Sequence, residues 1–278
     1  MALIAFWAAL LVVSAVGLAV SIGRARFQRY VNRAIQALDA TTPSREELAP
    51  LGELPVPVAR YRSLAVGDRA AVKTVVMRHG GTFRTTPAAK VLPIEGTQVF
   101  STDPPAYVWS ARVRMAPGLW FDACDTDIAG EGRMRVMIES LIPMVDQRGP
   151  EVDQGAALRL LAEMPWSPTA FFDTRYVRWS AIDASHALAT LRVGKQDVSC
   201  VFEFGPDGLP LSVSADRFRN AGERRPWGGT YRDYRSVAGM RVPFEVEVTW
   251  QLESGPYTYA HWIIESVEYN VPDLAPLN

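Results

Sequence analysis

The densest group of residues that could do chemistry is a set of four carboxylates: Asp122, Asp125, Asp127 and Glu131. Clustered carboxylate oxygens bind hard cations such as calcium, and they could also serve a hydrolase. The spacing differs from that of the EF-hand loop, which needs ligands at alternating positions and a glutamate at the twelfth. A solvated loop with aspartate turns, its charges paired with nearby arginines, is the favoured interpretation.

The three histidines form no recognisable catalytic or metal-binding pattern. His79, His186 and His261 are scattered, without the H-x-x-H or H-E-x-x-H spacing of a zinc site. A Ser-His-Asp triad assembles from distant positions and so stays open, but no Gly-x-Ser-x-Gly elbow nominates a serine. A P-loop and a dinucleotide fingerprint are also missing. No catalytic residue, metal or cofactor is therefore assigned, and the sequence leans away from an enzyme.

Aromatic and basic side chains indicate a second kind of chemistry, the binding of an apolar molecule with a polar head. The chain has eight tryptophans. Large aromatics suit strands and most often form ordinary core, but some could line a cavity for an acyl chain, with an arginine at its mouth. The candidate ligand-binding residues are Trp109, Trp166, Trp227, Trp250, Arg217 and Arg219.

Glu163 stands near the end of a predicted helix, where partial burial would require a partner for its charge. We expect that partner to be Arg217, Arg219 or Arg225, in a structural rather than a catalytic pair.

The two cysteines, Cys124 and Cys200, are far apart and form no C-x-x-C motif, which argues against a zinc site. Each lies in a strand-like stretch. Two separately buried thiols are favoured over a disulfide, which an oxidising compartment would permit.

The elements that position these residues are mostly strands, because from about Ala71 onward the dominant period is two. The clearest case is 242–252, where apolar side chains alternate with polar ones as in a half-buried antiparallel strand. A turn then leads into 257–269, which completes a terminal hairpin. Further strands are expected at 72–79, 107–115, 119–125, 133–140, 175–182, 186–193, 198–204, 209–219 and 229–237.

One internal helix interrupts the strands. Its apolar face is formed by Val152, Ala156, Leu160, Leu161 and Met164. Asp153 is placed to cap it and Pro165 to end it. The pattern predicts a mainly β (α+β) fold, in which an N-terminal transmembrane helix precedes a large curved antiparallel sheet. This half-barrel-like meander would have one or two covering helices, so it must curl on itself or leave a concave apolar cavity.

The segment Ala2–Ile22 has no charged residue, and at about 1.5 Å per residue it spans roughly the 30 Å of a hydrocarbon core. A cleaved signal peptide would carry a basic residue before a shorter apolar run. No such residue is present, so we expect a single-pass anchor in the cell (inner) membrane, with the lipid bilayer as its partner. The arginines that follow favour the cytoplasmic side for the domain. They are Arg24, Arg26, Arg29 and Arg33.

Residues 24–40 continue as a helix with apolar residues at i, i+3 and i+4 spacing. This helix could lie on anionic headgroups or pack on the domain, and its arginine density favours the headgroups. A linker with a short helix start at 42–47 follows. The domain organisation is therefore 1–23 as anchor, 24–53 as juxtamembrane helix and linker, and 54–278 as the antiparallel β domain.

Composition narrows the function classes. Hydrophobic residues make up 48% of the chain, charged residues 21%, and the formal net charge is −1. These are ordinary values for a globular protein. No basic stripe with interleaved aromatics lies outside the membrane-proximal arginines, so nucleic acid is not an expected partner. The oligomeric state is not specified by any of these features.

Several phrases of the sequence resemble, as an ordered set over residues 54–270, an uncharacterised bacterial family of membrane-anchored proteins known only as a domain of unknown function. They are LPVPVARY at 54–61, AYVW at 106–109, GEGRM at 130–134, LAEMPWSPT at 161–169, RPWGG at 225–229, Tyr234 with GMRVP at 239–243, and EVTW at 247–250. The predicted topology is also loosely similar to the lipoprotein-carrier (LolA/LolB-like) half-barrel. That resemblance implies an apolar cavity and assigns no site residue.

Three functions follow as hypotheses. The leading one is a membrane-tethered β domain that binds a lipid or another apolar ligand in a concave sheet. The alternatives are a protein-interaction module of a membrane complex, which would use exposed strand edges, and a hydrolase that uses the Asp122–Asp127 carboxylates.

Overall fold

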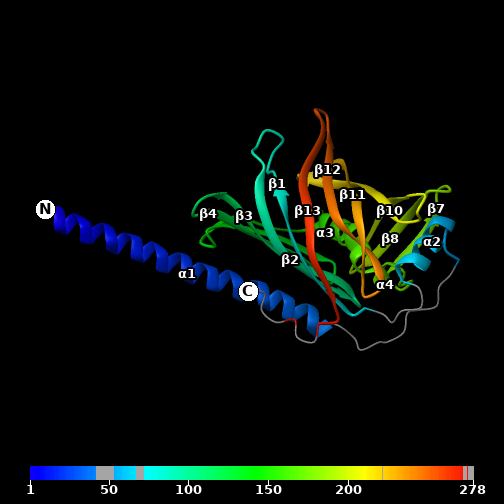
Figure 1. Ribbon diagram of the computed structural model, residues 1–278, viewed down its shortest axis with the longest axis horizontal. Coiled ribbons are helices and arrows are strands. Elements are labelled where there is room, and N and C mark those ends of the chain that lie inside the picture. Colours follow the sequence, from blue (N-terminus) through cyan, green and yellow to red (C-terminus); the bar gives the residue numbers. More distant parts are fainter. Residues whose placement is uncertain (42–52, 67–71, 221, 272–273, 275–278) are drawn as a thin grey trace.

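The computed structural model describes residues 1–41, 53–66, 72–220, 222–271 and 274. The expected helix start at 42–47 lies outside this part of the chain. In the described residues, a long N-terminal helix, α1 (Ala2–Thr41), precedes a single large antiparallel sheet with short helices on its inner face (Figure 1). The predicted mainly β fold with a curled half-barrel sheet is confirmed.

The sheet of the described residues has thirteen strands in the order β6-β5-β4-β3-β2-β1-β13-β12-β11-β10-β9-β8-β7. Sequence neighbours pair as hairpins except β6 and β7, which form the two edges, and the first and last strands meet in the middle of the sheet. The strands are β1 (Thr74–Phe83), β2 (Leu92–Thr102), β3 (Pro105–Ala116), β4 (Leu119–Ile128), β5 (Glu131–Ile138), β6 (Ile142–Arg148), β7 (Val177–Ala181), β8 (His186–Val193), β9 (Gln196–Phe204), β10 (Pro210–Asn220), β11 (Glu223–Val237), β12 (Met240–Leu252) and β13 (Gly255–Tyr269).

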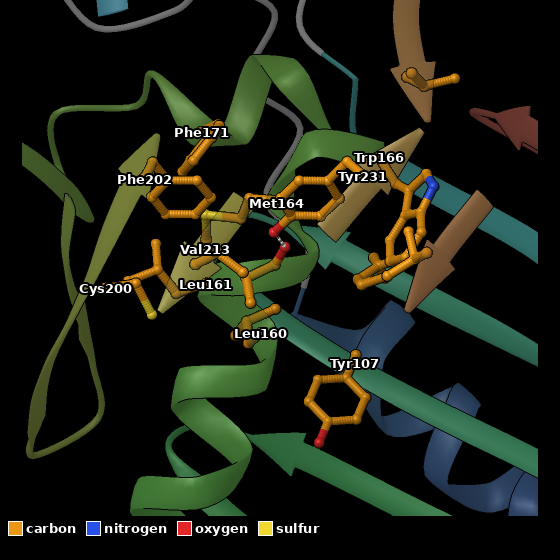
Figure 2. Close-up of a cluster of buried hydrophobic side chains, with 14 of the residues drawn as sticks. Tyr107, Leu160, Leu161, Met164, Trp166, Phe171, Cys200, Phe202, Val213 and Tyr231 are labelled. Atoms are coloured by element: carbon orange, nitrogen blue, oxygen red, sulfur yellow. Dashed lines mark hydrogen bonds between the residues drawn. The ribbon is translucent and has the colours of Figure 1, made fainter. Parts of the chain in front are cut away.

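Four short helical segments cover the inner, concave face: α2 (Val56–Ala65), α3 (Pro150–Glu163), the 3₁₀ turn η1 (Met164–Trp166) and α4 (Pro168–Phe171). Figure 2 shows Leu161 and Met164 of this helical layer close to the strand residues Phe202 and Val213. The inner face beneath α3 is therefore packed with the protein's own side chains. More helical segments cover the sheet than the one or two helices that were expected.

Helix α3 begins after Gly149 and ends at Glu163, immediately before the turn that contains Pro165. The predicted cap is wrong, because no side chain caps this helix. Asp153 lies in the first turn, and its carboxylate accepts a hydrogen bond of 2.7 Å from the Gly132 N–H instead. The aspartate thus ties α3 to the start of β5.

The sheet curls so strongly that two hairpin turns from its opposite halves meet. A Cβ placed on Gly130, in the β4–β5 turn, would come within 2.7 Å of the Val193 carbonyl oxygen and 2.9 Å of Gly194 Cα. Both glycines have positive φ angles, of 79° and 55°, which suit a residue without a side chain. The contact closes the half-barrel on that side.

The second half of α1 lies against the outer, convex face of the sheet. Phe27, Val31, Ile35 and Leu38 are buried there, in contact with strand residues that include Cys124. Of the two placements left open by the sequence, packing on the domain is therefore the one observed. The preceding residues of α1 are exposed and extend away from the sheet (Figure 1).

Candidate ligand-binding site on the inner face of the sheet

A buried charged cluster lies beneath α3, centred on Arg159. Its guanidinium donates to Glu163 Oε1 at 2.8 Å, to Asp125 Oδ2 at 2.9 Å and to Gln98 Oε1 at 3.1 Å. Gln98 in turn donates to Glu163 Oε2 at 2.5 Å. The expected partners of Glu163 are therefore wrong: its arginine is one turn earlier on its own helix, at the i,i+4 spacing.

The electrostatics of this cluster follow from its burial. Burial alone would lower the pKa of Arg159, but the negative charges of Glu163 and Asp125 outweigh it and raise that pKa. Burial raises the pKa of Asp125, and Arg159 opposes the shift. Arg159 also lies over the rings of Tyr107 and Trp109, at 5.1 and 4.7 Å. The arginine is therefore a permanent cation at the centre of the inner face.

Trp109, a predicted site residue, connects this cluster to His79. The indole N–H donates to His79 Nε2 at 2.9 Å, so Nε2 carries no proton in this arrangement. Burial lowers the pKa of His79 to about 4, and the nearby charge of Arg159 acts in the same direction. The imidazole is therefore a neutral acceptor at physiological pH.

Asp122, Asp125 and Asp127 lie on two faces of β4, and Glu131 begins β5, so the expected solvated loop is wrong. Asp122 faces outward and accepts hydrogen bonds from Arg112 at 2.8 Å, Trp120 at 2.8 Å and Ser140 at 2.5 Å. Asp125 and Asp127 face the interior. Burial raises the pKa of Asp127 to about 7. Because alternate side chains of a strand point to opposite faces, the three carboxylates cannot share one cation or one substrate.

Among the residues that the structure describes, no group of three or more His, Cys, Asp and Glu side chains is placed to hold a metal ion. The thiols of Cys124 and Cys200 are free and buried. Cys124 lies beneath α1 on the outer face, whereas the Cys200 thiol contacts the Leu158 carbonyl of α3 on the inner face, at 3.9 Å.

An aromatic band crosses the inner face beyond α3, from β4 to β11. Successive rings are in contact along it: the centroids of Phe121 on β4 and Phe83 on β1 are 6.4 Å apart, those of Phe83 and Tyr259 6.2 Å, and those of Tyr259 and Trp250 6.3 Å. Trp227 joins through its indole N–H, which donates to the Tyr259 hydroxyl at 3.1 Å. Phe83, Phe121 and Tyr259 are only half-buried, so the band reaches solvent.

Arg217 lies at the β11 end of this band, and Arg84 and Arg219 are close enough to Tyr257 for their charges to affect its pKa. The Arg217 guanidinium lies over Trp227 at 4.9 Å and over Trp250 at 5.8 Å. Its Nε is buried and donates no hydrogen bond within the described residues. The Tyr257 hydroxyl donates to the Arg84 carbonyl oxygen at 2.6 Å; burial raises the pKa of Tyr257, and the charges of Arg84 and Arg219 oppose that shift. Within the described residues, none of these arginines forms an ion pair at contact distance. The charge of Arg217 still acts to lower the pKa of Asp125, and that of Arg219 to lower the pKa of Glu223.

The structure brings three of the six predicted site residues into contact at the aromatic band, namely Trp227, Trp250 and Arg217, and the charge of a fourth, Arg219, acts on Tyr257. Trp109 lies deeper, with Arg159. Trp166 is elsewhere, in the core, with its N–H bonded to the Pro243 carbonyl oxygen at 2.8 Å.

Sequence reasoning missed the other members of the site, namely Phe83, Arg84, Phe121, Tyr257 and Tyr259. Phe121 and Tyr257 lie in strands that were predicted, so alternation could have placed them on the inner face. Phe83 ends β1 and Arg84 follows it, both beyond the predicted end of that strand at His79.

A groove of about 510 Å³ lies on the outer face, between α1 and strands β1 to β4. Arg24, Arg78 and Arg112 line it together with Glu95, Asp122 and Glu265. Its basic and acidic side chains are balanced, and Arg112 and Asp122 are paired with each other. The Arg217 guanidinium, which lies over two tryptophan rings and has a buried Nε without a hydrogen-bond partner among the described residues, makes the aromatic band the stronger candidate for binding an anionic molecule.

The chain is similar to three solved structures of other proteins. An outer membrane lipoprotein-sorting protein domain from Vibrio parahaemolyticus is 9% identical, with a TM-score of 0.42, covering 78% of this chain and 92% of that one. A LolA superfamily protein from Nitrosomonas europaea is 10% identical, with a TM-score of 0.35, covering 80% and 96%. A β-barrel-like protein of a domain of unknown function from Brucella abortus is 8% identical, with a TM-score of 0.25, covering 72% and 99%.

None of these three similarities is strong enough to carry a functional inference. No curated protein matches the sequence. A family model does match, over residues 43–262, which is most of the chain and most of the β domain. The protein belongs to the family of unknown function DUF6544.

Proposed function

We propose that this protein is a bilayer-tethered domain that binds an amphiphile, a lipid or another apolar molecule with an anionic head, on the aromatic band of its inner face. One observation carries the proposal: the Arg217 guanidinium lies across Trp227 and Trp250, with a buried Nε that donates no hydrogen bond within the described residues. A buried polar hydrogen without an acceptor costs free energy that a ligand oxygen would recover.

The chemistry of the site supports this choice of ligand. Arginine binds carboxylates and phosphates with two parallel hydrogen bonds, and Arg84 and Arg219 add positive charge near Tyr257. The rings of Phe83, Phe121 and Tyr259 offer an apolar surface that begins beside these charges. A head and a chain would thus each find a matching surface.

The tether would be α1. Ala2–Leu38 is long and apolar enough to cross a membrane. The same continuous helix then packs on the sheet through Phe27 and Val31, so cleavage after the apolar run would cut within one helix. This favours an anchor over a removable signal sequence. With Arg24 and Arg26 directly behind the span, we place the domain on the cytoplasmic side. The division at residues 23 and 53 stays a prediction.

The test is a titration of the full chain in detergent with a fluorescent fatty acid and with its uncharged methyl ester. Arg217→Gln should weaken acid binding at least tenfold and leave ester binding unchanged. Trp250→Leu should weaken both. The matched control Arg192→Gln, at an exposed position on β8, should change neither. No saturable binding of either probe to the wild-type chain would refute the proposal.

A second candidate is the protein-interaction module. In the described residues, β7 pairs only with β8, so its other edge is open to an added strand. Photocrosslinking from position 178 in native membranes tests it: discrete crosslinked partners would favour this function, and an uncrosslinked chain would count against it.

A further inference from the structure

Exposed apolar side chains gather at the ends of two hairpins. Leu119 follows the β3–β4 turn and is 41% exposed, and Leu141 in the β5–β6 turn is 39% exposed. Ile142 and Met144 begin the edge strand β6, and each is 58% exposed. Trp120, half-buried, stands beside Leu119. The fold leaves these side chains without a covering element in the described chain.

These hairpin ends lie where α1 leaves the domain. A Cβ placed on Gly23 would come within 2.7 Å of Leu141 Cδ2 and 2.9 Å of the Ser140 carbonyl oxygen. The Arg24 guanidinium lies 5.9 Å from the centre of the Trp120 ring. The apolar run ends at Ile22, one residue before this contact. The exposed side chains therefore continue the apolar surface of the helix onto the sheet.

We propose that Leu119, Trp120, Leu141, Ile142 and Met144 form a membrane-contact surface that enters the headgroup–acyl boundary of the bilayer crossed by α1. This inference rests on the proposed anchor. The surface has the composition that such a boundary favours: aliphatic side chains, a tryptophan whose N–H is bonded to Asp122 at 2.8 Å, and the guanidinium of Arg112 at 5.0 Å from the same ring.

The membrane-contact surface also lies next to one end of the aromatic band. Phe121, at one end of the band, directly follows Trp120 on β4 and points to the opposite face. A ligand leaving the bilayer at the membrane-contact surface would meet the first ring of the band on the other side of the same strand. The proposed site would thus be loaded from the bilayer with little exposure of the ligand to water.

Single cysteines test the contact. Ile142→Cys and Met144→Cys in the full chain are labelled with the polarity-sensitive dye NBD and reconstituted in phosphatidylcholine–phosphatidylglycerol vesicles. Native Cys124 and Cys200 are fully buried, so the introduced thiol is the one that reacts. The matched control is Ile182→Cys, which is 52% exposed and lies beyond β7. The dye at 142 and 144 should emit at shorter wavelength and be quenched severalfold more strongly by shallow nitroxide-labelled lipid than the dye at 182.

Vesicle flotation after an alkaline wash tests the membrane anchor separately from the membrane-contact surface. If the protein floats but the dye at 142 and 144 behaves like the dye at 182, the contact surface is refuted and the anchor stands. If the protein does not float, both are refuted. The fatty-acid titration in detergent needs no bilayer contact, so it judges the ligand site independently.

Discussion

At the scale of single residues, the inner face combines a satisfied charge with an unsatisfied one. Arg159 is surrounded by Glu163, Asp125 and Gln98, and its hydrogen bonds are made within the protein. Arg217, on β10, lies against aromatic rings and has a buried Nε without an acceptor among the described residues. The first arrangement is that of a structural element, whereas the second supports the proposed role of Arg217 in binding an anionic head.

We predict that Arg159→Met destabilises the fold severely, because it leaves the buried carboxylates of Asp125 and Glu163 without a counter-charge. Loss of one partner from a buried ion pair typically costs about 3–5 kcal/mol. Chemical denaturation of the full chain in detergent measures it. Arg192→Met, which removes an exposed pair with Asp197, is the control and should leave the midpoint unchanged. Equal midpoints for the two variants would contradict a structural role for Arg159.

A pH prediction concerns Asp127, whose pKa burial raises from 3.8 to about 7. The unfolded chain ionises this carboxyl more readily than the folded one, so stability falls as the pH rises from about 4 to about 7. Asp127→Asn removes this penalty, and the Tm of the variant relative to wild type should climb over that range. The scale is about 1.4 kcal/mol per unit of pKa shift. A Tm difference that does not change with pH would contradict a raised pKa for Asp127.

His79 has the opposite effect, since burial lowers its pKa from 6.5 to about 4. Between these pH values His79 is protonated in the unfolded chain but not in the folded chain, so stability falls as the pH decreases from about 6.5 to about 4. The contributions of His79 and Asp127 oppose each other in the wild-type protein. The difference in Tm between variant and wild type, followed against pH, is therefore the informative measurement.

At the scale of elements, α1 has two environments along one helix. Its first half is exposed, and its second half is buried against the outer face through Phe27, Val31 and Leu38. The arginines that follow the apolar run suggest a helix lying on headgroups, and sequence alone could not reveal that the outer face of β2 to β4 carries a matching apolar patch. Alternation of apolar and polar residues identifies a strand, but it does not show which face of the sheet a helix will cover.

We predict that Val31→Glu detaches α1 from the sheet without unfolding it, because the new charge cannot be buried among Val99, Val108 and Cys124. Maleimide labelling reports the change: Cys124, fully buried beneath α1, should become reactive, while Cys200, beneath α3, stays protected. If both thiols react, the variant has unfolded; if neither reacts, the helix has not detached and the prediction is wrong.

The strands with strict alternation, such as β12, were predictable because one face is core and the other solvent. Two strands were missed for physical reasons. In β2, Gly96 and Gln98 occupy inward positions that would normally be apolar, the former beside His79 and the latter in the Arg159 cluster. The edge strand β6 is exposed on both faces and has no alternation to detect. The short helix α2 was missed because Pro55 and Pro57 read as an extended lead-in.

At the scale of the whole molecule, the β domain depends on the docked half of α1. A chain beginning at Gly23 keeps Phe27 to Leu38, so we predict that it is monodisperse without detergent. A chain beginning at Leu54 exposes Val76, Val99 and Val108 to water and should aggregate. Size-exclusion chromatography with light scattering compares the two. Aggregation of the longer chain, or a soluble monomer from the shorter, would show that the helix does not serve as a cover.

The uninterrupted course of α1 has a mechanical consequence. Ala2–Thr41 is a single helix of 40 residues, about 60 Å long at about 1.5 Å per residue, and one half is fastened to the sheet. A continuous helix fastened in this way transmits any change in its tilt to the sheet. If the first half of α1 spans the bilayer as proposed, in a thinner bilayer it would tilt to shorten its projection, and the attached sheet would turn with it. Lipid composition would then set how deeply the hairpin ends are immersed, and the protein would respond to the thickness of the layer that holds it.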